Sequence, residues 1–212
     1  MIFRDIMEPF HIRAADIAIV TLATDGFKPG KDHILMLAAR RWEPTIQDRS
    51  PDLTQHVLIE GGDPSETVGI TGITPDIYMT QAISKEEAAT WFLELMDDWG
   101  TTCLAGHSAL RYMKPFLEIL LKSSERFQYL DTQLMSKIYH HRRWTLNDKI
   151  LSANQFMTEN SRLSFPRDPG TSLDAMLEHF GIEACDLACP YTAVAKSVET
   201  SEVLKRLWEV PI

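Results

Sequence analysis

Three apolar runs open the chain and predict three consecutive strands. They cover residues 15–23, 33–42 and 54–62, and the turn-forming residues Pro29 and Gly30 stand between the first two. Apolar runs of this length, bounded by Gly and Pro, are typical of strands joined by short turns. The pattern therefore predicts a hairpin followed by a third strand that ends at a pair of glycines.

The spacing of the apolar residues then changes to that of a helix. Between Ser84 and Gly100 they recur every three or four positions, which predicts one buried helix face. Ser84 and Glu87 stand at the spacing of a capping box, and Gly100 suits the helix end. The residues of the predicted buried face are Ala88, Trp91, Phe92, Leu95 and Trp99.

Short strands and helices alternate after this helix. Residues 102–106 predict a buried strand, and the apolar positions up to Lys122 predict an amphipathic helix behind it. The segment 127–140 begins like a strand and becomes helical at Asp131 and Thr132.

Two further helices are predicted near the end of the chain, over 171–182 and 192–208. Thr171 and Asp174 have capping-box spacing at the start of the first helix, and Gly181 follows its last apolar positions. Leading strands followed by alternating helices and strands predict an α/β or α+β domain with a mixed sheet.

The length of 212 residues fits a single domain over 1–212. Residues 1–14 precede the first strand and are interpreted as an N-terminal extension. Residues 142–170 are polar and mixed in composition, and are interpreted as an insertion or a mobile excursion. This segment also holds apolar residues that suit docking on a partner protein or on a second copy of the chain: Phe156, Met157, Leu163 and Phe165.

Charge and cysteine content narrow the classes of function. The net charge of −9 and the pI near 5.2 argue against broad nonspecific adhesion to nucleic acid, but they allow a local basic cleft. The chain has no apolar run of about 18 residues and no signal-peptide pattern, so no membrane partner is expected. Cys103, Cys185 and Cys189 lack the spacing of a zinc or redox motif, which favours reduced thiols in the cytoplasm.

Five stretches of the chain share their order and spacing with a known family. They are 20–39, 68–78, 104–121, 130–139, and the closing pair 172–182 with 198–207. Together they resemble the DEDDh 3′–5′ exonuclease family, whose best-known member is the proofreading epsilon subunit of bacterial DNA polymerase III. The resemblance implies a ribonuclease H-like α/β fold, with a mixed five-stranded sheet flanked by helices.

The resemblance also implies a reaction and the kinds of groups that perform it. In active relatives, four carboxylates hold two divalent ions that hydrolyse a phosphodiester, and a His acts as general base. Mg²⁺ and Mn²⁺ favour such oxygen ligands. Here the five catalytic positions fall on Thr21, Ala23, Tyr112, Tyr191 and Lys196. None of these is a carboxylate or a His, which predicts a pseudoenzyme without a metal or other cofactor.

The replaced positions predict an altered cleft. By the resemblance, Arg111, Tyr112, Tyr191 and Lys196 converge where the metals and the scissile phosphate lie in active relatives. A Lys ammonium pairs with phosphate and Tyr rings stack on bases, so these residues are candidates for nucleic-acid binding. The alternative is that Lys196 reaches solvent and the two tyrosines only fill the vacated space.

The most basic stretch, 139–144, contains Arg142 and Arg143 between aromatic residues. It is a second candidate for contact with nucleic acid. The alternative is a basic helix end, where His and Arg interact favourably with the helix dipole.

Two classes of function follow from these patterns. The first is a catalytically inactive exonuclease-fold protein that binds single-stranded DNA or RNA ends, or a partner protein, in DNA replication, repair or RNA processing. The alternative is an active 3′–5′ exonuclease with repositioned ligands and Mg²⁺ or Mn²⁺, for which Asp16, Asp25 and Glu199 are the acids to consider. A homodimer or an interaction scaffold is a third possibility.

Overall fold

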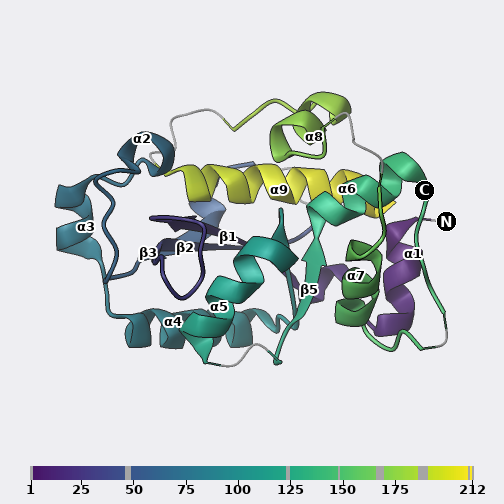
Figure 1. The fold of residues 1–212 in the computed structure, drawn as a ribbon, viewed down its shortest axis with the longest axis horizontal. Helices are drawn as coiled ribbons and strands as arrows, with labels where there is room; N and C mark the ends of the chain where they lie inside the picture. The colour runs from purple at the N-terminus through teal and green to yellow at the C-terminus, as the bar shows by residue number, and fades with distance from the viewer. Residues whose placement is uncertain are drawn as a thin grey trace.

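The computed structural model describes residues 2–45, 49–122, 125–147, 149–165, 170–185, 191–209 and 211. Within these ranges the strands form one five-stranded sheet in the order β3-β2-β1-β4-β5 (Figure 1). β2 is antiparallel to β1 and β3, whereas β1, β4 and β5 run parallel, so the sheet is mixed. The strands are β1 (Ile17–Thr24), β2 (Ile34–Arg41), β3 (Thr54–Leu58), β4 (Cys103–Gly106) and β5 (Gln128–Asp131).

Helices cover both faces of this sheet. α4 and α5 lie on one face, and α9 lies across the other face with α6 beside it (Figure 1). The α-helices are α1 (Phe3–Met7), α2 (Val68–Thr71), α3 (Pro75–Gln81), α4 (Lys85–Trp99), α5 (Lys114–Leu121), α6 (Thr132–His141), α7 (Ala153–Ser161), α8 (Leu173–Phe180) and α9 (Thr192–Glu209). The shorter elements are the 3-10 helices η1 (Glu8–Phe10), η2 (Ala14–Asp16) and η3 (Pro51–Leu53), and the π-helix η4 (Ala109–Met113).

The side chains of β1 alternate between two cores, as the pleat of a strand requires. Ala18 and Val20 pack in the core beneath α4 and α5. Ile17 and Ile19 pack in the core beneath α9. The same alternation sends residues 21 and 23 toward α9, and residues 22 and 24 toward η4 and α5.

The local signals for α4 are confirmed. Ser84 and Glu87 form the predicted capping box, and Gly100 ends the helix in the left-handed conformation, with φ +65°. On the predicted face, Trp91 and Trp99 remain partly exposed, whereas the other three residues are buried.

The capping box predicted for α8 is wrong. Ser172, and not Thr171, caps the helix, because its hydroxyl accepts the N–H of Ala175 at 3.3 Å. The carboxylate of Asp174 instead accepts a hydrogen bond from Lys196 of α9.

The third strand is shorter than predicted. β3 ends at Leu58, and the chain continues through α2 and α3, which the apolar pattern does not predict. Both helices lie at the end of the sheet where β1 and β2 join (Figure 1).

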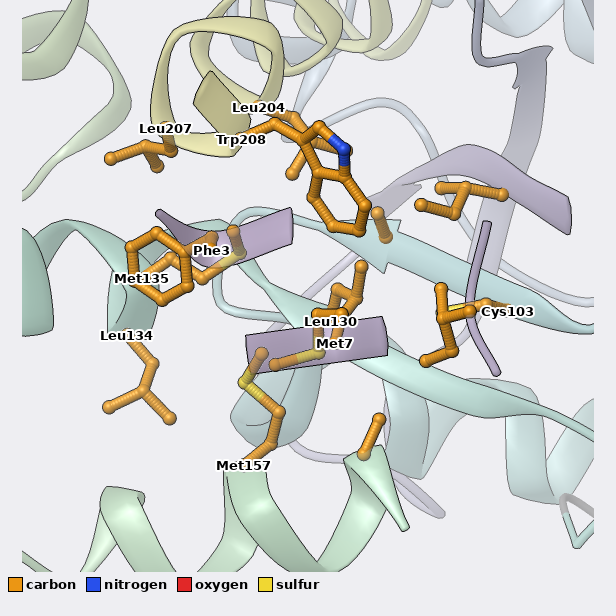
Figure 2. Packing of buried hydrophobic residues seen from close by; sticks show 14 of the residues in the cluster. Phe3, Met7, Cys103, Leu130, Leu134, Met135, Met157, Leu204, Leu207 and Trp208 are labelled. Atoms are coloured by element: carbon orange, nitrogen blue, oxygen red, sulfur yellow. The ribbon is translucent and has the colours of Figure 1, made fainter. Parts of the chain in front are cut away.

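Residues 142–170 do not form an excursion where the structure describes their middle part. α7 packs on β5, and its Ala153, Phe156 and Met157 are fully buried. In Figure 2, Met157 extends toward Met7 inside the core beneath α9. The docking role predicted for Phe156 and Met157 is therefore wrong, because neither side chain is accessible.

The N-terminal residues are also part of the core rather than an extension from it. Phe3, Ile6 and Met7 of α1 are at most 1% exposed and belong to the same core as α9. Figure 2 shows Phe3 and Met7 among side chains from the strands and from α9. α1 therefore helps to hold α9 on the sheet.

Candidate functional site

A cavity of about 170 Å³, here called the cleft, opens at the carboxyl end of β1. Its walls come from residues 22–27, from α2, from Tyr112 of η4, and from the first turns of α9. β1 pairs with the parallel β4 on one side and the antiparallel β2 on the other. The strand order reverses between β1 and β4, and open α/β sheets bind ligands at the carboxyl ends of the strands at such a point.

Thr21 and Ala23, the first two positions that the resemblance assigns to catalysis, face α9. The hydroxyl of Thr21 donates a hydrogen bond of 2.6 Å to the carbonyl oxygen of Ala193. Ala23 is 7% exposed and packs against Ala193 and Val194. Neither side chain presents an anionic oxygen to the cleft.

Tyr112, the third position that the resemblance assigns to catalysis, also lines the cleft. Its hydroxyl lies 2.6 Å from Oγ1 of Thr24, and its ring contacts Phe27 and Phe116 at centroid distances of 6.1 and 5.3 Å. Burial raises the pKa of Tyr112, although the hydrogen bond with Thr24 acts in the other direction. The phenol therefore stays neutral near pH 7 and does not replace a carboxylate.

Lys196 places a cation in the cleft. Its Nζ lies 2.8 Å from Oδ1 of Asp174 and 3.1 Å from Oε2 of Glu199. Burial alone lowers the pKa of a lysine, but these two carboxylates raise the pKa of Lys196 above its usual value. The ammonium is thus charged at neutral pH, and its charge is already balanced by the protein.

Arg111 and Tyr191 do not converge with these residues. Tyr191 packs edge-on against His56 of β3, at 5.3 Å between ring centroids, and its carbonyl accepts two N–H groups of α9. Arg111 also lies on η4, but it does not line the cleft and instead lines a separate groove. Of the four residues expected to meet, the structure brings together Tyr112 and Lys196.

The basic stretch at 139–144 ends α6. Arg142 lies at the helix end with φ +51°, its guanidinium 5.1 Å from the ring centroid of Tyr139. It also donates to the carbonyl of Pro211, and Arg143 donates to the carbonyl of Ser164 at 3.3 Å. These contacts agree with the alternative of a basic helix end, and the arginines do not line the cleft.

The acids considered as repositioned ligands already have partners. Asp25 accepts the N–H groups of His33 at 2.5 Å and Asp63 at 3.2 Å. Asp16 pairs with Arg13 at 2.8 Å. In the part of the chain that the structure describes, no three His, Cys, Asp or Glu side chains are grouped as metal ligands. This set of donors does not fit a pair of divalent ions.

His107 and Asp131 support the frame of the site. Asp131 ends β5 and accepts the N–H groups of Gln133 and Leu134 of α6 and of Leu110 at 3.0 to 3.2 Å. Burial raises the pKa of Asp131, against the effect of these bonds. Burial lowers the pKa of His107 to about 4, so this imidazole is neutral at pH 7.

Solved structures of E. coli exonuclease I have the same fold. A complex with a 5cy-dA13 oligonucleotide superposes with a TM-score of 0.60 and 17% identity. The zinc-bound form of a complex with single-stranded DNA gives 0.63 and 16%, and a product-bound structure gives 0.61 and 18%. The fold is ribonuclease H-like. This confirms the fold class predicted from the resemblance.

The similarity covers unequal shares of the two proteins. Each of these alignments spans 89% of this chain, but only 39%, 39% and 42% of the exonuclease I chain. Neither a protein-family model nor a curated protein sequence matches the chain.

Two other expectations from the sequence concern the membrane and the cysteines. No described helix has both the length and the apolar character to cross a membrane. Of the three cysteines, Cys189 lies outside the described residues.

Two apolar residues at the mouth of the cleft are absent from the predicted site. Phe27, in the turn after β1, is 84% exposed, and Ile70 of α2 is 71% exposed. Both line the cleft. A signal for Phe27 exists in the sequence, since a large apolar residue stands in the polar turn between Gly26 and Lys28.

Proposed function

We propose that this chain is a catalytically inactive exonuclease-fold protein that binds single-stranded nucleic-acid ends in the cleft. The observation that carries the proposal is the ammonium of Lys196, held by Asp174 and Glu199 in a cleft whose facing wall offers the hydroxyls of Thr24 and Tyr112. Hydrolysis by two metals needs several anionic oxygens around the ions. A balanced cation and neutral hydroxyls supply none.

The acids that could serve as repositioned metal ligands give little support to the alternative of an active exonuclease. Asp174 and Glu199 are paired with Lys196, so recruiting them for a metal requires breaking both ion pairs. Asp25 is held by backbone N–H groups of the hairpin and of residue 63. Each candidate acid has a structural task in the fold.

The cleft still offers a surface for a base. Phe27 is exposed to solvent and lies beside Tyr112, whose hydroxyl is fixed by Thr24. Stacking of a base on an aromatic side chain is worth about 1–3 kcal/mol and tolerates any base. The cavity of about 170 Å³ is smaller than a typical ligand pocket of roughly 300–1,000 Å³, so it suits one terminal base rather than several nucleotides.

The structural neighbours support this ligand class. The exonuclease I structures include complexes with dA13 and dT13 oligonucleotides that carry a 5cy group. The same fold therefore binds single-stranded DNA in that enzyme. We extend to this chain only the ligand class, and propose that it binds such a strand without cutting it.

A nuclease assay combined with a mobility shift tests the proposal. The purified protein is incubated with 5′-labelled single-stranded DNA and RNA in Mn²⁺, with EDTA and a Lys196→Ala variant as controls. We expect full-length strands in every lane and slower migration of the bound strands. Metal-dependent shortening that Lys196→Ala changes would mean an active nuclease, whereas shortening that it leaves unchanged would indicate a contaminant. Intact strands without any shift at low salt would favour an interaction scaffold.

A further inference from the structure

A second hollow, of about 650 Å³, lies on the other side of η4. We call it the basic groove. Its lining includes Arg111 of η4, Lys114 of α5 and Lys137 of α6. Residues 158–165, at the end of α7 and after it, close the third side.

The groove concentrates positive charge on an acidic protein. Among the described residues, no carboxylate lies within 4.0 Å of the charged groups of Arg111 or Lys137. Lys114 lies 3.7 Å from Glu118, the long end of the range for an ion pair. The chain as a whole has a net charge of −9, so this local group of cations is a site where an anionic ligand can bind.

The acid that lines the groove, Asp131, is not presented to a ligand. Its oxygens accept the N–H groups that begin α6 and that of Leu110, so the carboxylate is used within the fold. Asp131 is also only 4% exposed. The charged groups that a ligand meets in the groove are therefore Arg111, Lys114 and Lys137.

Neutral donors and an apolar edge complete the lining. The Oε1 of Gln133 accepts the hydroxyl hydrogen of Ser108 at 2.9 Å, so its NH₂ group remains as a donor. The exposed hydroxyl of Ser164 and the ring of Phe165 lie at the third side. Cations, an amide and hydroxyls are the groups that contact phosphate and sugar in nucleic-acid complexes.

We propose that the basic groove binds the phosphodiester backbone of a single strand. The bound part consists of internal nucleotides next to the strand end that enters the cleft. Arg111 and Tyr112 are neighbours on η4, and one lines the groove while the other lines the cleft, so a strand that crosses η4 reaches both. Three cations from three elements, lining a hollow of about 650 Å³, suit an extended polyanion better than one phosphate. The location of the end rests on the proposed function, but binding of the backbone in the groove does not.

Binding of a closed circular single-stranded DNA, which has no ends, tests the groove on its own. The full chain is titrated with the circle and with a linear strand of equal length over a series of salt concentrations. The binding constant K falls as salt rises, and for single strands each phosphate contact makes the slope of log K against log salt steeper by about 0.7. We expect the double variant Arg111→Ala/Lys137→Ala to make the slope on the circle shallower by about 1.4, since it removes two such contacts.

Two double variants serve as controls. Arg111→Lys/Lys137→Arg keeps both charges and should retain the slope of the unmodified protein. Lys85→Ala/Arg206→Ala removes two exposed cations of α4 and α9 that do not line the groove, and should also retain it. Equal unfolding midpoints would show that the variants are folded.

The outcomes separate the two proposals. An unchanged slope for Arg111→Ala/Lys137→Ala, or a protein that binds the linear strand and not the circle, would overturn the groove and leave end binding intact. Equal affinity for circle and linear strand, with a slope that depends on the groove, would support the groove and overturn end binding. Binding of neither DNA at low salt would overturn both.

Discussion

The Nζ of Lys196 lies 2.8 Å from Oδ1 of Asp174, which ties the first half of α9 to the first turn of α8. Glu199 holds the same ammonium from the other side, at 3.1 Å. A phosphate that entered the cleft would compete with two carboxylates for this cation. The cleft is therefore better suited to a base, and the phosphates are better served by the basic groove.

Loss of Lys196 should destabilise the fold, because it removes the cation that pairs with the almost fully buried carboxylate of Glu199. Breaking a fully buried ion pair costs about 3–5 kcal/mol, and screening at a partly exposed lysine reduces this to about 1–2 kcal/mol for Lys196→Met. Asp174 is 82% exposed in its side chain, so Asp174→Asn should change the free energy of unfolding by less than about 0.5 kcal/mol. Urea denaturation measures the free energy of unfolding of both variants. Equal losses would contradict the conclusion that the buried Glu199, and not Asp174, makes Lys196 important for stability.

A second variant isolates Glu199. Lys196→Met/Glu199→Gln removes the buried charge together with its partner, so it should recover part of the stability that Lys196→Met loses. If the double variant were as unstable as Lys196→Met, the loss would come from packing of the lysine stem instead.

The hydroxyl of Thr21 should contribute to docking of α9, because it donates to the carbonyl of Ala193. Thr21→Val keeps the shape of the side chain and should lower the free energy of unfolding by about 1 kcal/mol, and Thr21→Ser should retain most of it. Chemical denaturation of both variants checks this. A larger loss for Thr21→Ser than for Thr21→Val would assign the effect to the methyl group instead.

Much of the fold was predictable because its signals are local. The capping box of Ser84 and Glu87 and the strand-to-helix change at Asp131 depend on neighbours in the chain, and the structure has both. Lys196 was expected to meet a phosphate or solvent, whereas it meets Asp174, a residue that local spacing assigned to a cap. A contact between two helices cannot be read from the spacing within either one.

The sequence did not predict α7 as a buried helix, for a different reason. Its buried residues are Ala153, Phe156, Met157 and Asn160, a helical spacing that was present in the sequence. Asn160 hid the pattern because it is polar, yet it is fully buried and bonds to Thr145 through both its oxygen and its nitrogen. A buried polar residue that anchors a loop looks like a surface residue in a one-dimensional pattern.

Phe27 should be the residue that decides affinity for a strand end. Phe27→Ala removes the exposed ring and should weaken binding of a short 3′-ended oligonucleotide by about 1–3 kcal/mol, the worth of one stacked base. Met79→Ala is a matched control, since Met79 is 82% exposed on α3 and does not line the cleft. Fluorescence anisotropy gives both affinities, and equal values would remove Phe27 from the site.

The stability of the fold should depend on pH through His107. Burial lowers the pKa of His107 from 6.5 to about 4, so the fold favours the neutral imidazole. This contribution is complete above pH 6.5 and is lost as the pH falls toward 4, at a total of about 3 kcal/mol. The raised pKa of Asp131 acts in the opposite sense, so the wild-type protein is compared with His107→Gln rather than taken alone. The difference between the free energies of unfolding of the two proteins should shrink or change sign as the pH falls from 6.5 to 4. Parallel profiles of unfolding free energy against pH would show that His107 is not the titrating group.

α7 should be as essential to stability as the helices that cover the sheet. Phe156 is fully buried and its ring centroid lies 6.2 Å from that of Phe10, so Phe156→Ala removes a side chain that joins the N-terminal residues to β5. Truncation of a buried Phe costs about 3–5 kcal/mol. Leu151→Ala, two residues before the start of α7 and 77% exposed, should change stability by less than about 0.5 kcal/mol. Urea unfolding followed by far-UV circular dichroism measures both; a loss for Phe156→Ala no larger than that for Leu151→Ala would mean that residues 142–170 are detached from the core after all.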